Sequence, residues 1–517
     1  MRTYDYFRRA EQKFPERPAF ISDAVQYSFR QMGERSRRVG SALANKVSRE
    51  ARVAVYSPND VEAFACVLGT FFAGGCWVTL NARNAIDENV YILANTECEV
   101  LFLHSSMARH LGKIREGVPT LQRIVCIDRE LDGCESLDTF VSGVAASLPE
   151  LPEEPGRLVS ILSTGGTTGR PKGVMWTQRV WEAIVATFWI HQQSLEPPVQ
   201  LVCAPMTHAA GVLAMALMPA GATTVVLDHF EPLDVMEAIQ RHRITHLFLP
   251  PTAIYMMLGH PRVRDFDYSS LRCFLYAASP MAADKLREAI DVFGPVMVQS
   301  YGQAEAPMFC TMMTVEDHLE ALSRPEWEHR LWSCGRPTML TRLAIMGDDG
   351  ALLPPGERGE IVVGGSLVMD GYYKNPEATA EVSANGWHRT GDVGYQDEAG
   401  FVYHVDRKKD MIITGGFNVY SAEVEKIVLS HPSIQDCAVI GVPDDKWGEA
   451  VKAVVQTREG CLIDPDEIIA LCKERIGSIK APKSVDIWPE LPRSPVGKVL
   501  KRDIRARFWQ DRSRGVS

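Results

Sequence analysis

Short β-branched segments alternate with longer helical patterns along much of the chain. A strand pattern, a helical pattern and a second strand pattern follow one another at 51–57, 60–75 and 76–80, and again at 222–228, 234–242 and 244–250. Units of this kind are typical of α/β folds in which helices cover largely parallel sheets. A chain of 517 residues is also too long for one ordinary hydrophobic core. The sequence therefore predicts an α/β protein with at least two domains.

The pattern changes after about residue 340. Asp-Gly and Ala-Gly dipeptides between apolar segments predict hairpins there, which would form a small β-barrel-like part. Further along, strand and helix patterns suffice for a separate α+β domain. We place the large N-terminal domain at 1–408 and the small C-terminal domain at 409–517. Ser421 and Glu425 near the start of a helical pattern predict a helix cap.

Composition excludes several classes of protein. Hydrophobic residues make up 46% of the chain and charged residues 23%, as in ordinary globular proteins, and the net charge of −10 argues against nucleic acid as a partner. We expect no transmembrane segment and no signal peptide, because no apolar segment is long enough. Twelve cysteines without paired spacing favour reduced thiols over structural zinc, so we expect a cytoplasmic protein.

The segment 163–174, STGGTTGRPKGV, is dense in glycines, hydroxyl groups and cations. It is not a Walker A motif, because Lys172 follows a proline and the next residues form a strand pattern rather than a helix. We expect a loop between two strands that holds phosphate groups with backbone N–H groups and hydroxyls.

Six motifs occur in an order that resembles the adenylate-forming (AMP-binding) enzymes, in their acyl-CoA synthetase branch. They are STGGTTGRPKGV (163–174), SYGQAEAP (300–307), WSCGRP (332–337), WHRTGDVG (387–394), VDRKKDMIITGGFNVYSAEVE (405–425) and LPRSPVGKVLKRDIR (491–505). The resemblance runs over nearly the whole chain. It implies an enzyme that activates a carboxylic acid with ATP as an acyl-adenylate and then transfers the acyl group to a thiol. ATP, Mg²⁺ and coenzyme A are the implied cofactors.

The resemblance also implies residue roles. Lys498 is the implied catalytic cation, Glu305 the metal-associated carboxylate, and His208 a catalytic residue at the mouth of the acyl site. Tyr301 would stack on adenine, backbone near Ala278 and Ser279 would read its edge, and Asp392 and Arg407 would bind ribose. The implied nucleotide-binding residues are Thr164, Gly165, Gly166, Thr167, Thr168, Gly169, Lys172, Ala278, Ser279, Tyr301, Gly302, Gln303, Ala304, Asp392 and Arg407.

Two half-reactions are expected to use two positions of the C-terminal domain. The resemblance places the hinge at Lys409. It also places a loop with Gly415 and Gly416 at the site of thioester formation with coenzyme A. A large rotation about a few backbone positions is a known way for domains to exchange roles.

Some features leave alternatives open. Ala304 stands where the family usually has a threonine or serine that bonds a nucleotide phosphate. This difference could slow adenylation, and it leaves a half-enzyme that mainly converts a supplied acyl-adenylate as an alternative to the full two-step reaction. A carrier protein could replace coenzyme A as the acceptor, and a nucleotide-binding pseudoenzyme is the alternative from a different class. Apolar segments after His208 and Glu305 favour a hydrophobic monocarboxylic acid, whether fatty, alicyclic or aryl. Monomer and homodimer both remain open.

Overall fold

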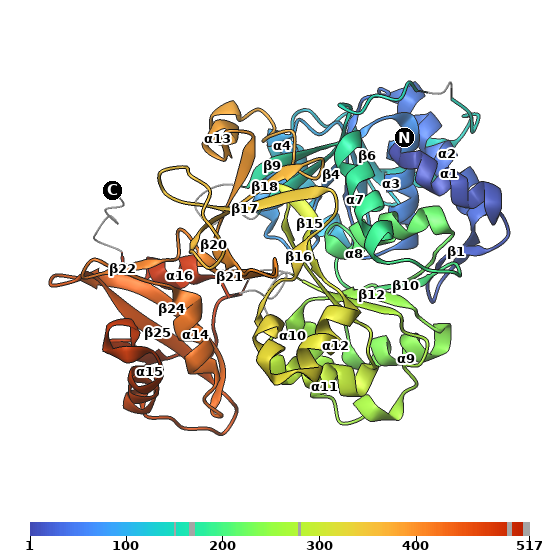
Figure 1. Ribbon diagram of the computed structural model, residues 1–517. Helices are drawn as coiled ribbons and strands as arrows, with labels where there is room; N and C mark the ends of the chain where they lie inside the picture. Colours follow the sequence, from blue (N-terminus) through green and yellow to red (C-terminus); the bar gives the residue numbers. More distant parts are fainter. Residues whose placement is uncertain (149–150, 165–170, 278–280, 494–498, 510–517) are drawn as a thin grey trace. The chain divides into compact units, whose positions relative to one another are not determined.

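The structure is a computed structural model that describes residues 1–148, 151–164, 171–277, 281–493 and 499–509 (Figure 1). Its first sheet contains seven strands among these residues, and neighbours are parallel except for the antiparallel pair β8–β9. In spatial order the strands are β7 Glu135–Ser136, β6 Arg123–Cys126, β5 Val100–Leu103, β3 Arg52–Tyr56, β4 Cys76–Thr79, β8 Leu158–Thr164 and β9 Lys172–Thr177.

A second sheet holds nine of the described strands. In spatial order they are β16 Arg336–Pro337, β15 Ala306–Met313, β14 Met297–Gln303, β13 Cys273–Tyr276, β12 His246–Leu249, β10 Val199–Val202, β11 Thr223–Val226, β1 Pro18–Ile21 and β2 Gln26–Ser28. Its central neighbours from β14 to β1 are parallel, whereas β15, β16 and β2 pair antiparallel at the edges. Because buried parallel strands need helices on both faces, the predicted alternation of strands and helices is the pattern this sheet requires.

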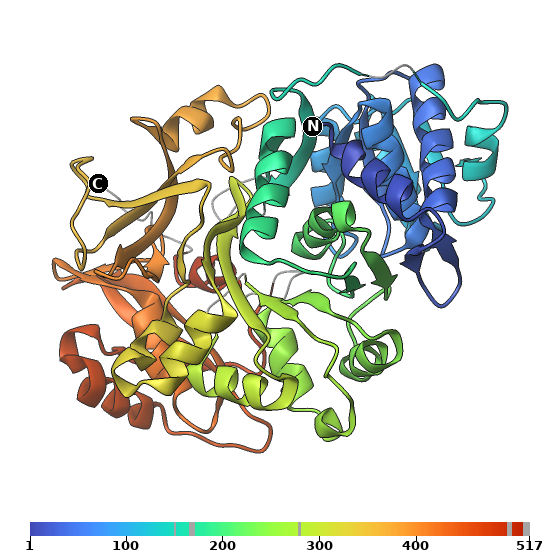
Figure 2. The ribbon, with the colours of Figure 1, turned by 45° about the vertical axis from the view of Figure 1, so that its right-hand side comes forward.

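Helices connect and cover these two sheets. They are α1 Thr3–Lys13, α2 Phe29–Lys46, α3 Val61–Ala73, α4 Ile86–Asn95, α5 Leu111–Gly117, α6 Leu137–Val141, α7 Gln178–His191, α8 Ala209–Leu217, α9 Pro232–His242, α10 Pro251–Leu258, α11 Ala283–Phe293 and α12 Val315–Ser323, with short 3₁₀ helices at Ser105–His110, Met218–Ala220, Val263–Asp265 and Pro325–Trp332. The helices α2 and α3 lie side by side (Figure 1 and Figure 2). Asp60 caps α3, since its carboxylate accepts hydrogen bonds from the backbone N–H groups of Glu62 and Ala63.

Two smaller sheets follow in the chain. One contains β17 Thr341–Met346, β18 Gly359–Gly365, β20 Trp387–Gln396 and β19 Ser383–Ala384, with β21 Val402–Arg407 paired to β20, and the helix α13 Pro376–Glu381 lies between its strands in sequence. The other contains β23 Phe417–Val419, β22 Ile412–Thr414, β25 Gly448–Thr457 and β24 Ile434–Asp444, with β26 Ser484–Ile487 paired to β25 and with helices α14 Ser421–Leu429, α15 Pro465–Lys480 and α16 Lys501–Ala506. The α/β class predicted from the sequence, with a large N-terminal and a small C-terminal part, is confirmed.

The chain forms two compact units. Unit 1 consists of Met1–Leu343, Val363–His388 and Gly400–Val402, and unit 2 consists of Ala344–Val362, Arg389–Ala399 and Tyr403–Ser517. Unit 1 contains both large sheets and a core that includes the fully buried Trp176, Trp181 and Phe309. Unit 2 contains the sheet of β22 to β26, whose core includes Val439 and Val454. Each unit therefore has its own hydrophobic core.

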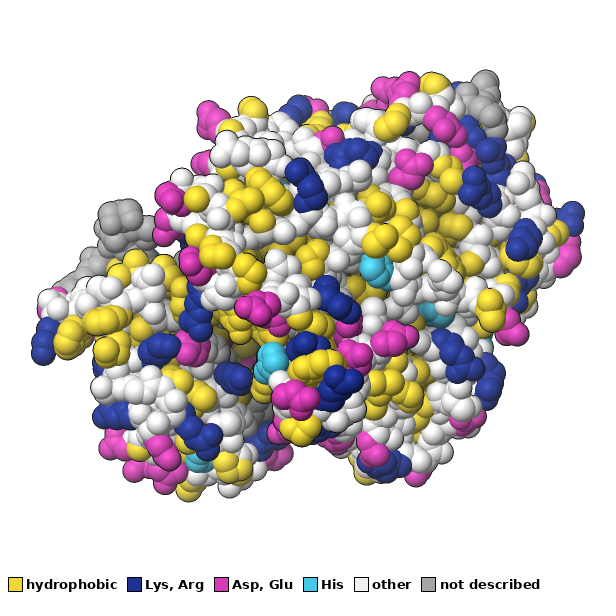
Figure 3. All heavy atoms as spheres, viewed as in Figure 1, with side chains coloured by type: hydrophobic (Ala, Val, Ile, Leu, Met, Phe, Trp, Pro, Cys, Tyr) yellow, Lys and Arg dark blue, Asp and Glu magenta, His cyan; other side chains and the backbone are white. Residues whose placement is uncertain are grey.

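The surface mixes charges of both signs. On the face drawn in Figure 3, Lys and Arg side chains stand next to Asp and Glu side chains, and apolar side chains lie between them. In the part of the chain that the structure describes, no helix is both long enough and apolar enough to cross a membrane.

Candidate active site

The strands β8 and β9 form the two sides of the predicted phosphate loop. Thr164 at the end of β8 is paired with Lys172 at the start of β9, and the Thr164 hydroxyl lies 3.4 Å from the Lys172 carbonyl oxygen. The prediction that strands flank the loop is confirmed. The predicted phosphate-binding residues Gly165, Gly166, Thr167, Thr168 and Gly169 lie outside the described residues.

Glu305 lies in the turn between β14 and β15, and its side chain is buried. The Tyr372 hydroxyl donates a 2.8 Å hydrogen bond to Oε1 of Glu305. The ammonium group of Lys172 lies 4.8 Å from the centre of the Tyr372 ring, within cation–π distance. Burial, reinforced by the Glu305 carboxylate, raises the pKa of Tyr372 well above its ordinary value, so the phenol keeps its proton and acts as a donor. Thus unit 1 brings together two predicted site residues through a tyrosine that was not predicted.

The backbone of the β14–β15 turn is held tightly. Tyr301 pairs with Thr311 across the ladder, and Gln303 pairs with Ala306. A Cβ atom on Gly302 would lie 2.6 Å from the backbone nitrogen of Met308, so this position requires glycine. The indole N–H of Trp176 donates a 2.7 Å hydrogen bond to the Ala304 carbonyl oxygen. Strand β9 is thereby connected to the turn that carries Glu305.

Two further predictions for the adenine site concern the segment after β13. Ala278 and Ser279 lie outside the described residues, although β13 ends just before them at Tyr276. Ala304, at the position where the family usually has a hydroxyl, packs its methyl group against the core of unit 1.

His208 directly precedes α8, and its Nδ1 atom lies 3.0 Å from the Thr207 hydroxyl. Desolvation lowers the pKa of His208 to about 4, so the imidazole is neutral near pH 7. The helix that follows is apolar, and Leu213 and Met215 are buried in the main core. A neutral histidine at the edge of an apolar region can donate or accept hydrogen bonds to an incoming carboxylic acid without adding a charge.

Asp392 and Arg407 lie close together in unit 2. Oδ1 of the buried Asp392 is 3.6 Å from Nε of Arg407 and 3.5 Å from Nε2 of His404. The Lys408 backbone N–H donates a 2.8 Å hydrogen bond to the Gly391 carbonyl oxygen, which joins the two segments. The two residues predicted to bind ribose are therefore neighbours, and the carboxylate is of a type that can accept hydrogen bonds from a diol.

The predicted hinge and thioester loop are also in unit 2. Burial, with a contribution from Arg407, lowers the pKa of Lys409 to about 8. Gly415 and Gly416 form the tight turn between β22 and β23 with φ values of 56° and 82°, in the region that favours glycine. A Cβ atom on Gly415 would lie 2.5 Å from the Trp447 ring. The predicted catalytic residue Lys498 lies outside the described residues, directly before the described Val499.

The carboxylate available for a magnesium–nucleotide ligand is that of Glu305. Among the described residues there is no cluster of three or more His, Cys, Asp or Glu side chains that could hold a metal ion. Glu305 is a single buried carboxylate that is oriented by Tyr372. Mg²⁺ is commonly held by one or two carboxylates together with substrate phosphates, so a single buried carboxylate is a suitable protein ligand for it.

One local prediction is wrong. Ser421 and Glu425 do not cap α14, because the helix begins at Ser421 itself and Tyr420 at its N-cap has no side-chain hydrogen bond. Instead the Ser421 hydroxyl donates a 2.8 Å hydrogen bond to Asp406, and Glu425 forms a 2.8 Å ion pair with Lys501. Sequence spacing alone does not reveal that these partners come from distant segments.

The sequence is similar to known protein families and to characterised enzymes. The family description "AMP-binding enzyme" matches residues 7–373, and "AMP-binding enzyme C-terminal domain" matches residues 423–498. The medium/long-chain-fatty-acid–CoA ligase FadD8 of Mycobacterium tuberculosis is 35% identical over 93% of this chain and 87% of its own length. The feruloyl-CoA synthase of an Amycolatopsis species is 35% identical over 97% of this chain and 98% of its own length.

A solved structure shows the same fold. The amide bond synthetase McbA from Marinactinospora thermotolerans is 30% identical, with a TM-score of 0.87 over 98% of this chain and 100% of its own. The chain therefore belongs to the AMP-binding, or adenylate-forming, enzyme family, in its acyl-CoA synthetase branch. It is accordingly an AMP-forming acid–thiol ligase whose cofactors are ATP, Mg²⁺ and coenzyme A.

Proposed function

We propose that the chain joins a hydrophobic monocarboxylic acid to coenzyme A in two half-reactions. In the first, a carboxylate oxygen attacks the α-phosphorus of ATP, and the bond to pyrophosphate breaks. In the second, the coenzyme A thiol, having lost its proton, attacks the acyl carbon of the adenylate, and the bond to AMP breaks. The principal difficulty of the first step is that two anions must meet, so positive charge has to be supplied.

The observation that carries the proposal is the cluster of Lys172, Tyr372 and Glu305 in unit 1. In this cluster one tyrosine contacts both groups: its ring face lies under the Lys172 ammonium group, and its hydroxyl donates to the buried Glu305 carboxylate. Mg²⁺ held by Glu305 and the phosphates would neutralise charge on the nucleotide. Lys172 would contact the outer phosphates that leave as pyrophosphate.

Other residues would bind the remaining parts of the substrates. Asp392 would accept hydrogen bonds from the ribose hydroxyls, with Arg407 beside it, and Tyr301 would stack on the adenine. His208, neutral near pH 7, would orient the acid carboxylate at the mouth of the acyl site. Lys498 would contact the carboxylate and the α-phosphate during adenylation.

The second half-reaction requires a different catalytic surface. We propose that rotation at Lys409 removes Lys498 and brings the Gly415–Gly416 turn to the acyl-adenylate. The tight turn supports this role, because its backbone can approach a ligand closely without a side chain. We accordingly assign 1–408 to nucleotide and acyl binding and 409–517 to the mobile part.

The acid is proposed to be hydrophobic. The relatives named above act on medium- or long-chain fatty acids and on ferulate, so both a fatty and an aryl acid are represented. The segment after His208 is apolar and rich in methionine, which suits an adaptable apolar pocket. Twelve free cysteines support a cytoplasmic setting.

The deciding experiment is exchange of labelled pyrophosphate into ATP with Mg²⁺ and without coenzyme A, over a panel of fatty, alicyclic and aryl acids. Acid-dependent exchange would establish adenylation and identify the class of acid. Release of AMP on addition of coenzyme A would establish the complete reaction. No exchange with any acid, together with rapid thioester formation from supplied acyl-adenylate, would favour the half-enzyme suggested by Ala304.

The acceptor needs its own test. Because an amide bond synthetase shares this fold, the same preformed acyl-adenylate should be offered separately to coenzyme A, a carrier protein and a simple amine. Preference for coenzyme A is expected. Preference for the amine or the carrier protein would overturn the assignment of the acceptor while leaving adenylation intact.

A further inference from the structure

The segment 369–373 connects two parts of the candidate site. The Met369 backbone N–H donates a 2.8 Å hydrogen bond to the carbonyl oxygen of Glu305. The next residues pair with strand β9, through Asp370 N–H to Met175 O at 3.2 Å and Tyr373 N–H to Gly173 O at 2.7 Å. Five consecutive residues thus hold the turn that carries Glu305 and the strand that begins at Lys172.

The side chain of Tyr372 connects the same two parts at the level of their functional groups. Its hydroxyl donates to Oε1 of Glu305 at 2.8 Å, and its ring lies beneath the ammonium group of Lys172 at 4.8 Å from the ring centre. The tyrosine side chain is buried, so the contacts are shielded from water. A hydrogen bond to a charged group is stronger than one between neutral groups, and a buried charge is costly without one.

We propose that Tyr372 is a positioning residue that sets Glu305 and Lys172 for binding of the magnesium–ATP complex. The identity of this ligand rests on the proposed function, whereas the contacts themselves do not. Through its hydroxyl Tyr372 directs the Glu305 carboxylate, and through its ring it holds the Lys172 ammonium group. It does not touch the reacting atoms in this role.

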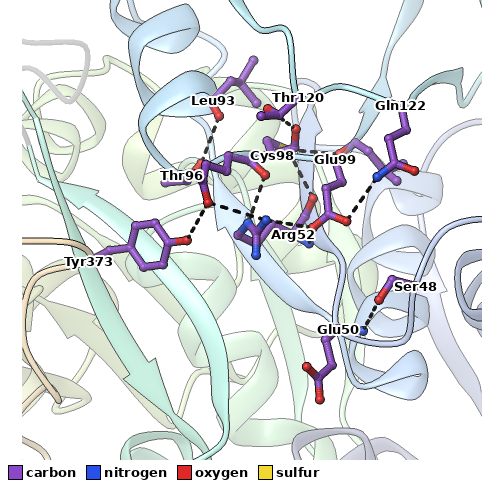
Figure 4. A network of polar contacts seen from close by, with 12 residues as sticks. Ser48, Glu50, Arg52, Leu93, Thr96, Cys98, Glu99, Thr120, Gln122 and Tyr373 are labelled. Atoms are coloured by element: carbon purple, nitrogen blue, oxygen red, sulfur yellow. Dashed lines mark hydrogen bonds and ion pairs between the residues drawn. The ribbon is translucent and has the colours of Figure 1, made fainter.

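The neighbouring Tyr373 offers a matched control, because adjacent residues of an extended segment point to opposite sides. Its hydroxyl lies 3.4 Å from Oε2 of Glu97, and Figure 4 shows it at the edge of the polar network around Arg52. Arg52 in turn forms a 3.1 Å ion pair with Glu99. Tyr373 is therefore a partly buried tyrosine of the same segment whose hydroxyl serves a different cluster.

The test compares Tyr372→Phe with Tyr373→Phe in the full chain. Calorimetric titration with ATP at several fixed Mg²⁺ concentrations should show about tenfold weaker binding for Tyr372→Phe and less than about a twofold change for Tyr373→Phe. Pyrophosphate exchange should require more Mg²⁺ for half-maximal rate in Tyr372→Phe. Thioester formation from supplied acyl-adenylate should be retained, because the outer phosphates and their metal ion have left by then.

Three controls separate a loss of folding stability, failure of the role proposed for Tyr372 and failure of the proposed function. Thermal unfolding of Tyr373→Phe should match that of the unchanged protein, whereas Tyr372→Phe keeps the ring but leaves the buried Glu305 carboxylate without its donor and should unfold at a slightly lower temperature. A loss of stability accompanied by equal losses in both half-reactions would indicate a merely structural role and overturn the proposal. Equal ATP affinity and Mg²⁺ dependence in the two variants would also overturn it. If the unchanged protein exchanges no pyrophosphate with any acid, the proposed function fails, but the ATP titrations still decide whether Tyr372 positions the site.

Discussion

The ammonium group of Lys501 lies 2.8 Å from Oε1 of Glu425, and both side chains are largely enclosed within unit 2. The same ammonium group donates a 2.7 Å hydrogen bond to the Ser421 hydroxyl, which donates in turn to Asp406. This cluster joins the first turn of α16, which follows the predicted catalytic residue Lys498, to α14 and to the segment before the predicted hinge. It therefore helps to fix the start of α16, close in the chain to Lys498.

Replacing Lys501 by methionine should strongly destabilise unit 2. The Glu425 carboxylate would remain buried without its cation, and breaking a buried ion pair in this way typically costs about 3–5 kcal/mol. Hydrogen exchange of the α14 and β24 amides should accelerate accordingly. Arg502→Met changes the adjacent, half-exposed cation, whose ion pair with Asp503 is at the surface, and should change stability by less than about 0.5 kcal/mol. Similar exchange in both variants would contradict the importance of the cluster.

Replacing Gly302 by alanine should disrupt the turn that carries Glu305. The added Cβ atom would lie 2.6 Å from the Met308 nitrogen and 2.7 Å from the Ala306 carbonyl oxygen, so the backbone must move. A displacement of this kind at a reacting site can lower rates about 100-fold, which we expect for pyrophosphate exchange. Gly112→Ala, at a position with no atom within 4 Å of the added carbon, should retain full activity. An active Gly302→Ala enzyme would show that the turn tolerates the shift.

Replacing Lys498 by alanine should separate the two half-reactions. Pyrophosphate exchange should fall by at least about 100-fold, because the cation that meets the carboxylate and the α-phosphate is lost. Thioester formation from supplied acyl-adenylate should continue at nearly the original rate. Normal adenylation by the variant would refute the role proposed for Lys498, and loss of both steps would indicate damage to the C-terminal unit.

The stability of unit 1 should decrease in mild acid. Desolvation lowers the pKa values of the buried His246 and His318 to about 4, whereas an unfolded histidine titrates near pH 6.5. Between these values the unfolded chain binds more protons, so the free energy of unfolding falls as the pH falls from about 6.5 to 4. Each histidine contributes at most about 1.4 kcal/mol per pH unit.

Urea unfolding followed by hydrogen exchange of unit 1 at pH 7, 6 and 5 measures this dependence. His246→Gln should reduce the slope, because one of the desolvated histidines of unit 1 is removed. His229→Gln, which changes a ring that is 58% exposed, should leave the slope unaltered. An equal slope in the His246 variant and the unchanged protein would show that protonation of His246 does not cause the loss of stability in mild acid.

Much of the fold could be predicted because it depends on local patterns. The β-branched residues of β3 and β4 and the capped apolar helix α3 between them are visible in the sequence as strand, helix and strand. The strands on either side of the phosphate loop and the motifs that contain Asp392 and Arg407 are also visible in the sequence. The separation of Asp392 and Arg407 along the chain does not show that the two side chains lie next to each other.

Tyr372 and Lys501 illustrate what the sequence could not reveal. Tyr372 lies outside the six motifs recognised in the sequence, and its contact with Glu305 spans 67 residues. Lys501 resembles an ordinary surface lysine until the fold brings it to Glu425, 76 positions earlier in the chain (501 − 425). Ser421 was interpreted as a cap because capping is judged from neighbours, whereas its actual partner is Asp406.

The sequence by itself determined the class of fold, the order of the motifs and the types of group that the chemistry needs, because these depend on periodicity, turn residues and side-chain chemistry within short windows. The tertiary structure alone decided which buried charges are paired and which side chain orients Glu305 and Lys172. The reason is physical: burial and charge pairing arise from contacts between segments far apart in the chain, which local preferences do not encode.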